Sequence, residues 1–186
     1  MAEAITWLGR LTPTTVTATF SGISQDYTHL IAKGYCQADS DSTSAWTNND
    51  GYINFNGDYG TGAHYGYMHQ FFYGYITNPT KQMSKNQNAT EMWMATDRKK
   101  YSGSNTNSWS TITAKIYNYT STSTTSQAKK AVMWWAGINN LANDCFYSNS
   151  TNLLTNDSAA ITSLGFRNSN GWVSGTIFDL YGVKVG

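Results

Sequence analysis

The sequence predicts an all-β protein, a single-domain antiparallel β-sandwich that we expect to be a jelly roll of about eight strands. Aromatic residues make up 15% of the 186 residues, whereas charged residues make up only 12%. Ser, Thr and Asn supply about a third of the chain. These polar residues favour strands and turns over helices. Short segments also alternate between apolar and polar residues, and turn-forming clusters separate them.

The clearest expected strands are residues 15–20 and 112–116. In the first of these, Val16, Ala18 and Phe20 fall on one face, because side chains alternate across a strand. Each such segment therefore offers one face to a core and the other to water. The remaining expected strands are residues 27–36, 51–56, 65–76, 89–95, 131–138, 160–167 and 176–185.

Two of the expected strands depart from simple alternation. Residues 131–136 are almost continuously apolar, which is typical of a central strand covered on both faces or of a strand at a subunit contact. Around Ile161 and Leu164 the period slips by one residue, which suggests a β-bulge. No apolar stripe with helical spacing persists anywhere in the chain.

Turn chemistry divides the chain, but no shift of composition marks a domain boundary. Turn-rich clusters lie at residues 49–51, 56–58, 101–105 and 168–171, and residues 119–129 read as an exposed loop or a polar edge strand. We expect an N-terminal arm over residues 1–13 and a sandwich domain over residues 14–186. The arm would either add a strand to a neighbouring subunit or pair within its own sandwich.

Charge and targeting signals limit the partners. The net charge is +1, and the densest basic cluster is residues 98–100, with a lesser pair at residues 129–130. This is a weak footprint for nucleic acid, so we expect no nucleic-acid partner. No stretch approaches the length of a membrane span, and residues 1–10 lack a signal-peptide pattern. Cys36 and Cys145 are expected to be apolar residues without a bridge, in a chain that folds in a reducing compartment.

The histidines do not form a convincing catalytic or metal site. His64 and His69 are five residues apart, which puts them on opposite faces of a regular strand and argues against a shared metal ion. We interpret His29 as a partly buried histidine whose ring is satisfied by a hydrogen bond. A general base would need a second group to orient it, and none is evident.

The carboxylates give no stronger signal. Asp39 and Asp41 lie in a Ser/Asp-rich turn that lacks the glycine and the distal glutamate of a calcium loop, so a solvated loop is expected. A glycosidase would need two carboxylates flanking one bond, and no such pair is evident. We therefore predict no catalytic residue, no metal and no cofactor, and a protein that is not an enzyme. The aromatic clusters at residues 65–75 and 134–135 read first as core and then as an interface.

Three segments resemble small virion proteins of tailed bacteriophages. Residues 20–30 (FSGISQDYTHL) resemble the F-x-x-I-x-x-x-Y-T-H-L opening of those proteins, and residues 175–184 (GTIFDLYGVK) resemble their G-x-x-x-x-L-Y-G-I-K ending. Residues 53–58 (INFNGD) are similar to their F-N-G-D segment. Physically, residues 180–182 would form the last core strand, with Gly182 permitting a close approach. Tyr27 and His29 would then cap the first long strand against this last strand.

This resemblance implies a jelly-roll virion component without enzymatic activity. The expected function is a capsid decoration, or cement, protein that binds the major capsid protein and stabilises the outer shell. It would be made in the cytoplasm of the host bacterium and would act at the virion surface. A homo-oligomer is expected, and a trimer would suit the three-fold positions of an icosahedral shell. The alternative is a tail or tail-fibre module that binds host-surface glycans through Tyr and Trp residues such as Trp109. The binding residues themselves stay unassigned.

Overall fold

The computed structural model describes residues 3–39, 50–58, 65–75, 80–89, 92–95, 109–122, 130–139, 144–154 and 159–186. The chain is all-β, as predicted, and these residues contain no helix. The strands are β1 (Glu3–Leu11), β2 (Thr17–Phe20), β3 (His29–Cys36), β4 (Asp50–Phe55), β5 (Tyr65–Tyr75), β6 (Thr80–Ala89), β7 (Met92–Ala95), β8 (Ser110–Tyr117), β9 (Lys130–Asn139), β10 (Asp144–Leu154), β11 (Leu164–Asn168) and β12 (Ile177–Val185). For β5, β6, β9 and β10 the description covers the backbone only.

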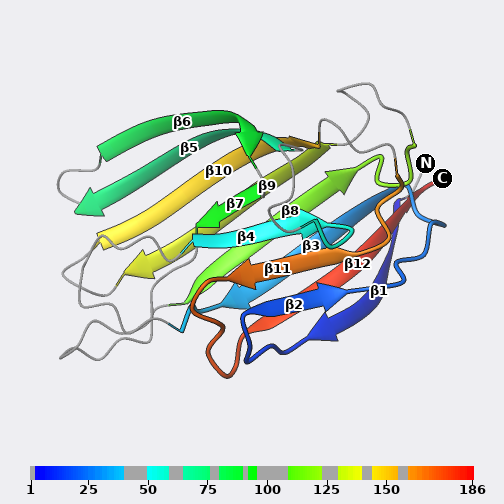
Figure 1. Ribbon diagram of the computed structural model, residues 1–186, viewed down its shortest axis with the longest axis horizontal. Helices are drawn as coiled ribbons and strands as arrows, with labels where there is room; N and C mark the ends of the chain where they lie inside the picture. Colours follow the sequence, from blue (N-terminus) through cyan, green and yellow to red (C-terminus); the bar gives the residue numbers. More distant parts are fainter. Residues whose placement is uncertain are drawn as a thin grey trace.

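The strands form two antiparallel sheets that pack as a β-sandwich (Figure 1). The large sheet has eight strands in the order β1-β12-β3-β8-β9-β10-β5-β6. The small sheet has four strands in the order β2-β11-β4-β7. In Figure 1 the small sheet lies over the part of the large sheet that contains β1, β12, β3 and β8, and the two chain ends lie close together.

Twelve strands are described where the sequence predicts about eight. Eight of them divide equally between the sheets, because β1, β3, β8 and β12 belong to the large sheet and β2, β4, β7 and β11 to the small sheet. Among these eight, the chain changes sheet at every step except from β4 to β7. The other four form two hairpins, β5–β6 and β9–β10, which pair with each other through β10 and β5 and widen the large sheet. This distribution of the strands favours the jelly-roll topology, which stays a prediction.

The N-terminal segment is part of the sandwich. Residues Glu3–Leu11 form β1, which pairs antiparallel with β12 of the same chain from Glu3 opposite Val185 to Leu11 opposite Phe178. Of the two alternatives for residues 1–13, the structure therefore shows pairing within the chain's own sheet. The expected division between an arm and a domain at residue 13 has no counterpart in the sheets, because β1 completes the edge of the large sheet.

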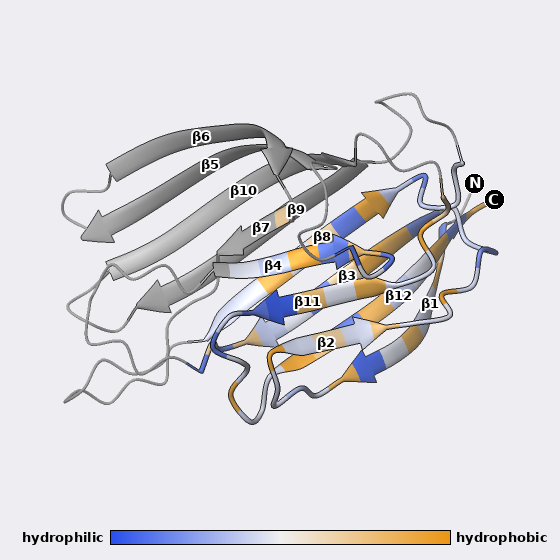
Figure 2. Ribbon diagram, viewed as in Figure 1, coloured by the Kyte–Doolittle hydropathy of each residue, from blue (hydrophilic) through white to orange (hydrophobic). Residues whose placement is uncertain are grey.

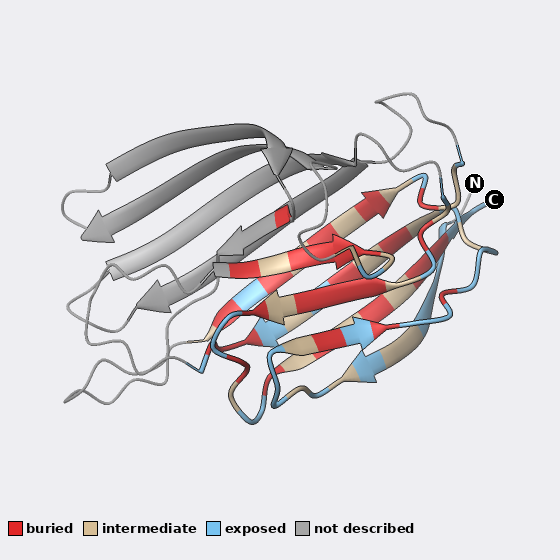
Figure 3. Ribbon diagram, in the orientation of Figure 1, coloured by how far each residue is buried: buried red, intermediate tan, exposed pale blue. Residues whose placement is uncertain are grey.

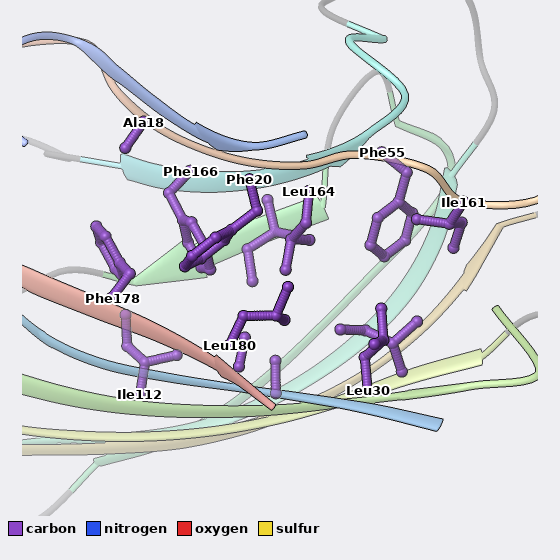
Figure 4. Close-up of a cluster of buried hydrophobic side chains, with 14 of the residues drawn as sticks. Ala18, Phe20, Leu30, Phe55, Ile112, Ile161, Leu164, Phe166, Phe178 and Leu180 are labelled. Carbon is purple, nitrogen blue, oxygen red and sulfur yellow. The ribbon is translucent and has the colours of Figure 1, made fainter. Parts of the chain in front are cut away.

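Aromatic rings join the two sheets at the centre of the core (Figure 4). Phe166 of β11 stacks on Phe178 of β12 with 4.1 Å between ring centroids and 7° between ring planes. Phe20 meets the edge of Phe166 from β2, and Trp172 meets Phe178 edge-on. Aliphatic side chains such as Leu30 surround these rings, and the buried residues run along both facing sheets in Figure 3.

Alternation explains why these strands form. β8 buries Ser110, Ile112, Ala114 and Ile116, and the residues between them are exposed or half-buried. The same change of polarity from one residue to the next is visible along β8 in Figure 2. A strand that alternates in this way satisfies its backbone in the sheet and buries one apolar face against the opposite sheet.

Two of the predicted turns are present among the described residues. Asn56 and Gly57 both have positive φ, at 53° and 71°, and the Asp58 N–H donates to the Phe55 carbonyl over 3.0 Å. This is the backbone conformation that Asn-Gly pairs favour. The Gly171 N–H closes the second turn on the Asn168 carbonyl over 3.1 Å. The expected turn at residues 101–105 lies outside the described residues.

The predicted bulge near Ile161 is wrong. β11 begins only at Leu164, and its pairings with β2 and β4 show no register shift. Ile161 is buried in the preceding loop, where its N–H donates to the Tyr119 carbonyl over 2.8 Å. Asn56 holds the same loop, because its side-chain oxygen accepts from the Thr162 N–H over 2.8 Å. The slip in the hydrophobic period therefore marks the end of a loop that is fixed by tertiary hydrogen bonds.

Residues 119–129 begin with a buried anchor, which an exposed loop or polar edge strand does not predict. Tyr119 is fully buried, and its hydroxyl donates to the Ser24 carbonyl. Burial raises the pKa of the Tyr119 hydroxyl, so this group stays a neutral donor. Residues 123–129 lie outside the described part of the chain.

Candidate functional site

One face of the large sheet points away from the small sheet, and we call it the outer face. Leu30, Ala32 and Cys36 of β3 are buried toward the core, so the residues between them face outward. Register extends this face across the neighbouring strands. Its residues are Glu3, Ile5, Trp7 and Arg10 of β1, Ile177, Asp179, Tyr181, Val183 and Val185 of β12, His29, Ile31, Lys33 and Tyr35 of β3, and Thr111, Thr113, Lys115 and Tyr117 of β8. Among these residues, Val183 is buried.

A β-bulge in β1 brings two outer-face residues together. Trp7 pairs with Tyr181 and Gly9 pairs with Leu180, so the register shifts by one residue between them. Trp7 and Arg10 are three positions apart and would face opposite sides of a regular strand. The bulge puts both of them on the outer face, where both reach Asp179.

Asp179 is the centre of a polar cluster on this face. Arg10 donates from Nε to Oδ1 and from Nη2 to Oδ2, each over 2.8 Å, and Trp7 donates from Nε1 to Oδ1 over 3.3 Å. The hydrogen bonds from Arg10 lower the pKa of the Asp179 carboxyl, and the same pairing raises the pKa of Arg10. The indole of Trp7 is thus held at its nitrogen, while the side chain stays 59% exposed.

Further aromatic contacts lie beside this cluster. The Lys33 ammonium sits 5.7 Å from the centre of the Tyr181 ring, within the range of a cation–π contact. Tyr35 stacks on Trp109 with 4.7 Å between ring centroids and 7° between ring planes. Tyr35 is 47% exposed, so this stacked pair presents a flat apolar surface to solvent. Trp109, expected to be exposed, is instead half-buried, because its ring also lies against Gly175.

The first half of β1 is exposed on both of its faces. Every residue from Glu3 to Trp7 is exposed, including Ala4 and Thr6, which point to the side opposite Ile5. Ile5 is 61% exposed and Val185, near it on β12, is 42% exposed. Because β1 is also the last of the described strands in its sheet, this apolar surface lies next to an edge that no other described strand covers.

His29 lies at the margin of the outer face. It is half-buried, as predicted, and meets the ring of Tyr117 edge-on with 5.0 Å between ring centroids. Its Nδ1 atom is buried and has no hydrogen-bond partner among the described residues. The expected hydrogen bond is therefore absent at Nδ1, and the ring instead packs against Tyr117.

The other residues considered for chemistry do not meet in the described structure. Asp39 is exposed and directly follows Ala38, which forms an isolated β-bridge with Trp172. Asp41 and His64 lie outside the described residues. His69 occupies a position in β5 opposite Ser150 of β10. No group of three or more His, Cys, Asp or Glu side chains within the described ranges is arranged to hold a metal ion. Cys36 is buried in the core as a thiol.

Residues 20–30 and 175–184, two of the three segments from which the virion-protein resemblance is expected, pack against each other. A Cβ atom on Gly182 would lie 2.6 Å from Cδ1 of Tyr27, so the tyrosine ring sits directly against the backbone of β12. The Thr28 N–H donates to the Val183 carbonyl over 2.8 Å, and the Val185 N–H donates to the Thr28 hydroxyl over 3.2 Å. These contacts match the close approach that the sequence predicts for Gly182.

Sequence reasoning missed the cluster of Trp7, Arg10 and Asp179. Arg10 and Asp179 are 169 positions apart, and a bulge hides the shared face of Trp7 and Arg10 from a period-two reading. The one local signal was a Trp close to an Arg in a segment with few other charges.

None of the residues that the structure describes forms a helix long and apolar enough to cross a membrane. No family model, no curated protein and no solved structure matches this chain.

Proposed function

We propose that this protein is a non-enzymatic structural component of a phage virion, a capsid decoration protein that binds the outer shell. The observation that carries the proposal is the outer face of the large sheet, where aromatic and aliphatic side chains are exposed beside a few fixed charges. Ile5, Trp7 and Tyr35 are each between 47% and 61% exposed. Exposed apolar residues grouped on one face are typical of a protein interface.

The chemistry of this face suits a protein partner. Trp and Tyr bury large areas while losing few rotamers, and they dominate the energetics of many interfaces. Asp179, Arg10 and Lys33 are already held by hydrogen bonds or by a ring, so little side-chain entropy is lost when a partner covers them. A protein that binds only the assembled shell stabilises that shell by mass action.

The packing of the resembling segments supports the same proposal. Tyr27 and Gly182 belong to the opening and the closing segments, and they meet in one contact. The resembling residues would therefore maintain the packing of the sandwich, and the residues that bind a partner would lie on the outer face and differ between such proteins.

The first test is the copy number of this protein in purified particles of its source virus, measured by quantitative mass spectrometry. A count comparable to the major shell protein supports the decoration role. A count of a few to a few tens would assign the protein to the tail and overturn that role. Complete absence from the particles would overturn both virion roles.

A binding test locates the surface. We expect Tyr35→Ala to weaken binding to purified shells at least tenfold, because it removes half of the stacked aromatic pair. Val16→Ala is the matched control, since Val16 is 43% exposed but precedes β2 of the small sheet. Equal binding by both variants would exclude the outer face as the shell-binding surface.

A second candidate function is a tail or fibre module that binds glycans. The Tyr35–Trp109 pair favours it, because a flat exposed ring can stack on the apolar face of a sugar. Glycan binding that is lost in Trp109→Ala, together with a low copy number, would establish this function in place of the first.

A further inference from the structure

The edge strand β1 is long and carries exposed apolar side chains, a combination that is unusual at the edge of a β-sheet. β1 is nine residues long and ends the large sheet. Its exposed half carries Ile5 and Trp7, both more than half exposed, with Val185 nearby. Native edge strands are usually short, charged or covered, because free backbone groups beside apolar side chains pair with other strands. Within the described ranges, no further strand pairs with this edge.

The bulge makes β1 complementary to itself. Leu8 and Gly9 together occupy one position of the ladder, so the outer-face residues read Glu3, Ile5, Trp7 and Arg10 at even spacing. The centre of this series is Thr6. Reversing the strand about Thr6 exchanges Ile5 with Trp7 and Glu3 with Arg10.

We propose that β1 pairs antiparallel with β1 of a second copy of this chain, about a twofold axis at Thr6. Ile5 then packs beside Trp7 of the second copy, and Glu3 lies beside Arg10 of the second copy. Thr6 faces Thr6 of the second copy across the axis. An interface with twofold symmetry uses the same patch twice, and directly opposed residues are the unit of strand pairing.

The side chains on this edge have the capacity for these contacts. Arg10 is 52% exposed and uses two N–H groups on Asp179, and a guanidinium has five such donors. A further carboxylate beside it, from Glu3 of the second copy, is therefore accommodated. The pairing places Ile5 and Trp7 of the two copies side by side on one shared outer face, and it satisfies the free backbone groups of both edges.

Symmetry favours two copies. Antiparallel pairing of identical edges consumes both edges, so the assembly closes at the dimer. A ring of three would need β1 to pair with a different edge of the next copy. The two large sheets become one continuous sheet with both outer faces on the same side. The dimer does not depend on the proposed virion role and is tested without particles.

Cysteine cross-linking tests the register. Directly opposed residues on antiparallel strands have Cα atoms about 4.5–5.5 Å apart, and a disulfide needs about 4.4–6.8 Å. We expect Thr6→Cys to form a covalent dimer on mild oxidation. Ala4→Cys is the matched control, because the two copies of residue 4 would be four ladder positions apart, about 13 Å along the strand. The unmodified chain controls for Cys36 and Cys145.

Sedimentation of the full chain tests the assembly. We expect a dimer whose dissociation constant rises at least tenfold in Ile5→Asp and is unchanged in Val16→Asp, with the same circular dichroism spectrum in both variants. A monomer at all concentrations, or a trimer, would overturn the proposal. So would a dimer in which Thr6→Cys fails to cross-link, or in which Ala4→Cys cross-links equally well.

Discussion

Gly182 is a residue whose small size is required by one neighbour. It lies in β12 with an ordinary strand conformation, so backbone freedom does not explain it. The ring of Tyr27 lies where a side chain would begin, because its Cδ1 and Cδ2 atoms are both 2.6 Å from the point that a Cβ atom would occupy. An aromatic ring in a packed setting cannot bend away at low cost.

We therefore expect Gly182→Ala to destabilise the protein by about 1–3 kcal/mol, the usual cost of overpacking. Chemical denaturation followed by circular dichroism measures it. The double variant with Tyr27→Ala provides the control, because removing the ring removes the clash. The two changes should then cost less together than the sum of the single changes. Simple additivity would show that the strain lies elsewhere.

Asp179 makes stability depend on pH through its bonds to Arg10. The pKa of its carboxyl is lowered in the folded state, whereas an unfolded Asp has a pKa of about 3.9. A lowered folded pKa contributes stability above the unfolded value, and this contribution is lost as the pH falls through the folded pKa.

We expect Asp179→Asn to lower the melting temperature slightly at neutral pH. The difference from the unmodified protein should begin to shrink below about pH 4 and vanish once the pH lies below the lowered pKa of the Asp179 carboxyl. Melting curves between neutral and acidic pH measure it. Arg10→Gln should give the same profile, since both changes remove one pair. A difference that persists unchanged in acid would show that Asp179 acts through packing.

At the scale of elements, the bulge in β1 is the feature that organises the outer face. It lets Leu8 and Leu11 both pack against the core while Trp7 and Arg10 both face outward. Without the extra residue Gly9, β1 would be a regular strand in which Leu8 and Leu11 still face the core and Trp7 and Arg10 still face outward.

Deletion of Gly9 should therefore be tolerated, with a loss of less than about 1 kcal/mol, because Leu8, Arg10 and Leu11 then alternate correctly. Deletion of Lys33 from the centre of β3 is the contrasting change. It moves every later residue of that strand to the wrong face, and we expect it to abolish folding. Measured stabilities of the two variants compare them directly. Equal losses would mean that the bulge is required for more than side-chain direction.

The sequence analysis did not predict β6 and β10, and the reason is the same for both strands. β6 and β10 are rich in polar residues and lack a clean period of two. Both belong to the hairpins that widen the large sheet. Alternation is a signal of one buried face, so a strand held mainly by its neighbours in the sheet gives a weak signal.

At the scale of the whole molecule, the contact between Phe166 and Phe178 joins the two sheets. Both rings are essentially buried, and they stack at 4.1 Å between centroids. Trp172 and Phe20 close the cluster from either side. A change here acts on the association of the sheets as well as on one side chain.

We expect Phe178→Ala to destabilise the protein by about 3–5 kcal/mol, because it leaves a cavity between the sheets. Phe178→Leu should cost less, since more of the volume is kept. Urea denaturation at neutral pH measures both, and Val16→Ala should change stability by less than about 0.5 kcal/mol as an exposed control. A small effect of Phe178→Ala would show that the sheets are held together elsewhere.

The sequence by itself determined the fold class and most strands of the sandwich. Alternation at residues 17–20 and 112–116, and the Asn56-Gly57 turn, are local properties that need no knowledge of neighbours. The expected inward face at residues 15–20 is wrong for Val16, which precedes β2 and is 43% exposed. The close approach at Gly182 was also readable, because glycine within a strand marks such contacts.

Only the tertiary structure decided which strands became neighbours, and hence which side chains form the outer face. Arg10 meets Asp179 across 169 positions of the chain, a contact that no local pattern encodes. The number of strands in the large sheet and the position of β1 at its edge were also decided by tertiary pairing. Strand order depends on burial and backbone pairing summed over the whole molecule. The alternation of apolar and polar residues shows only which face of a strand is buried, and it does not show which strands become neighbours.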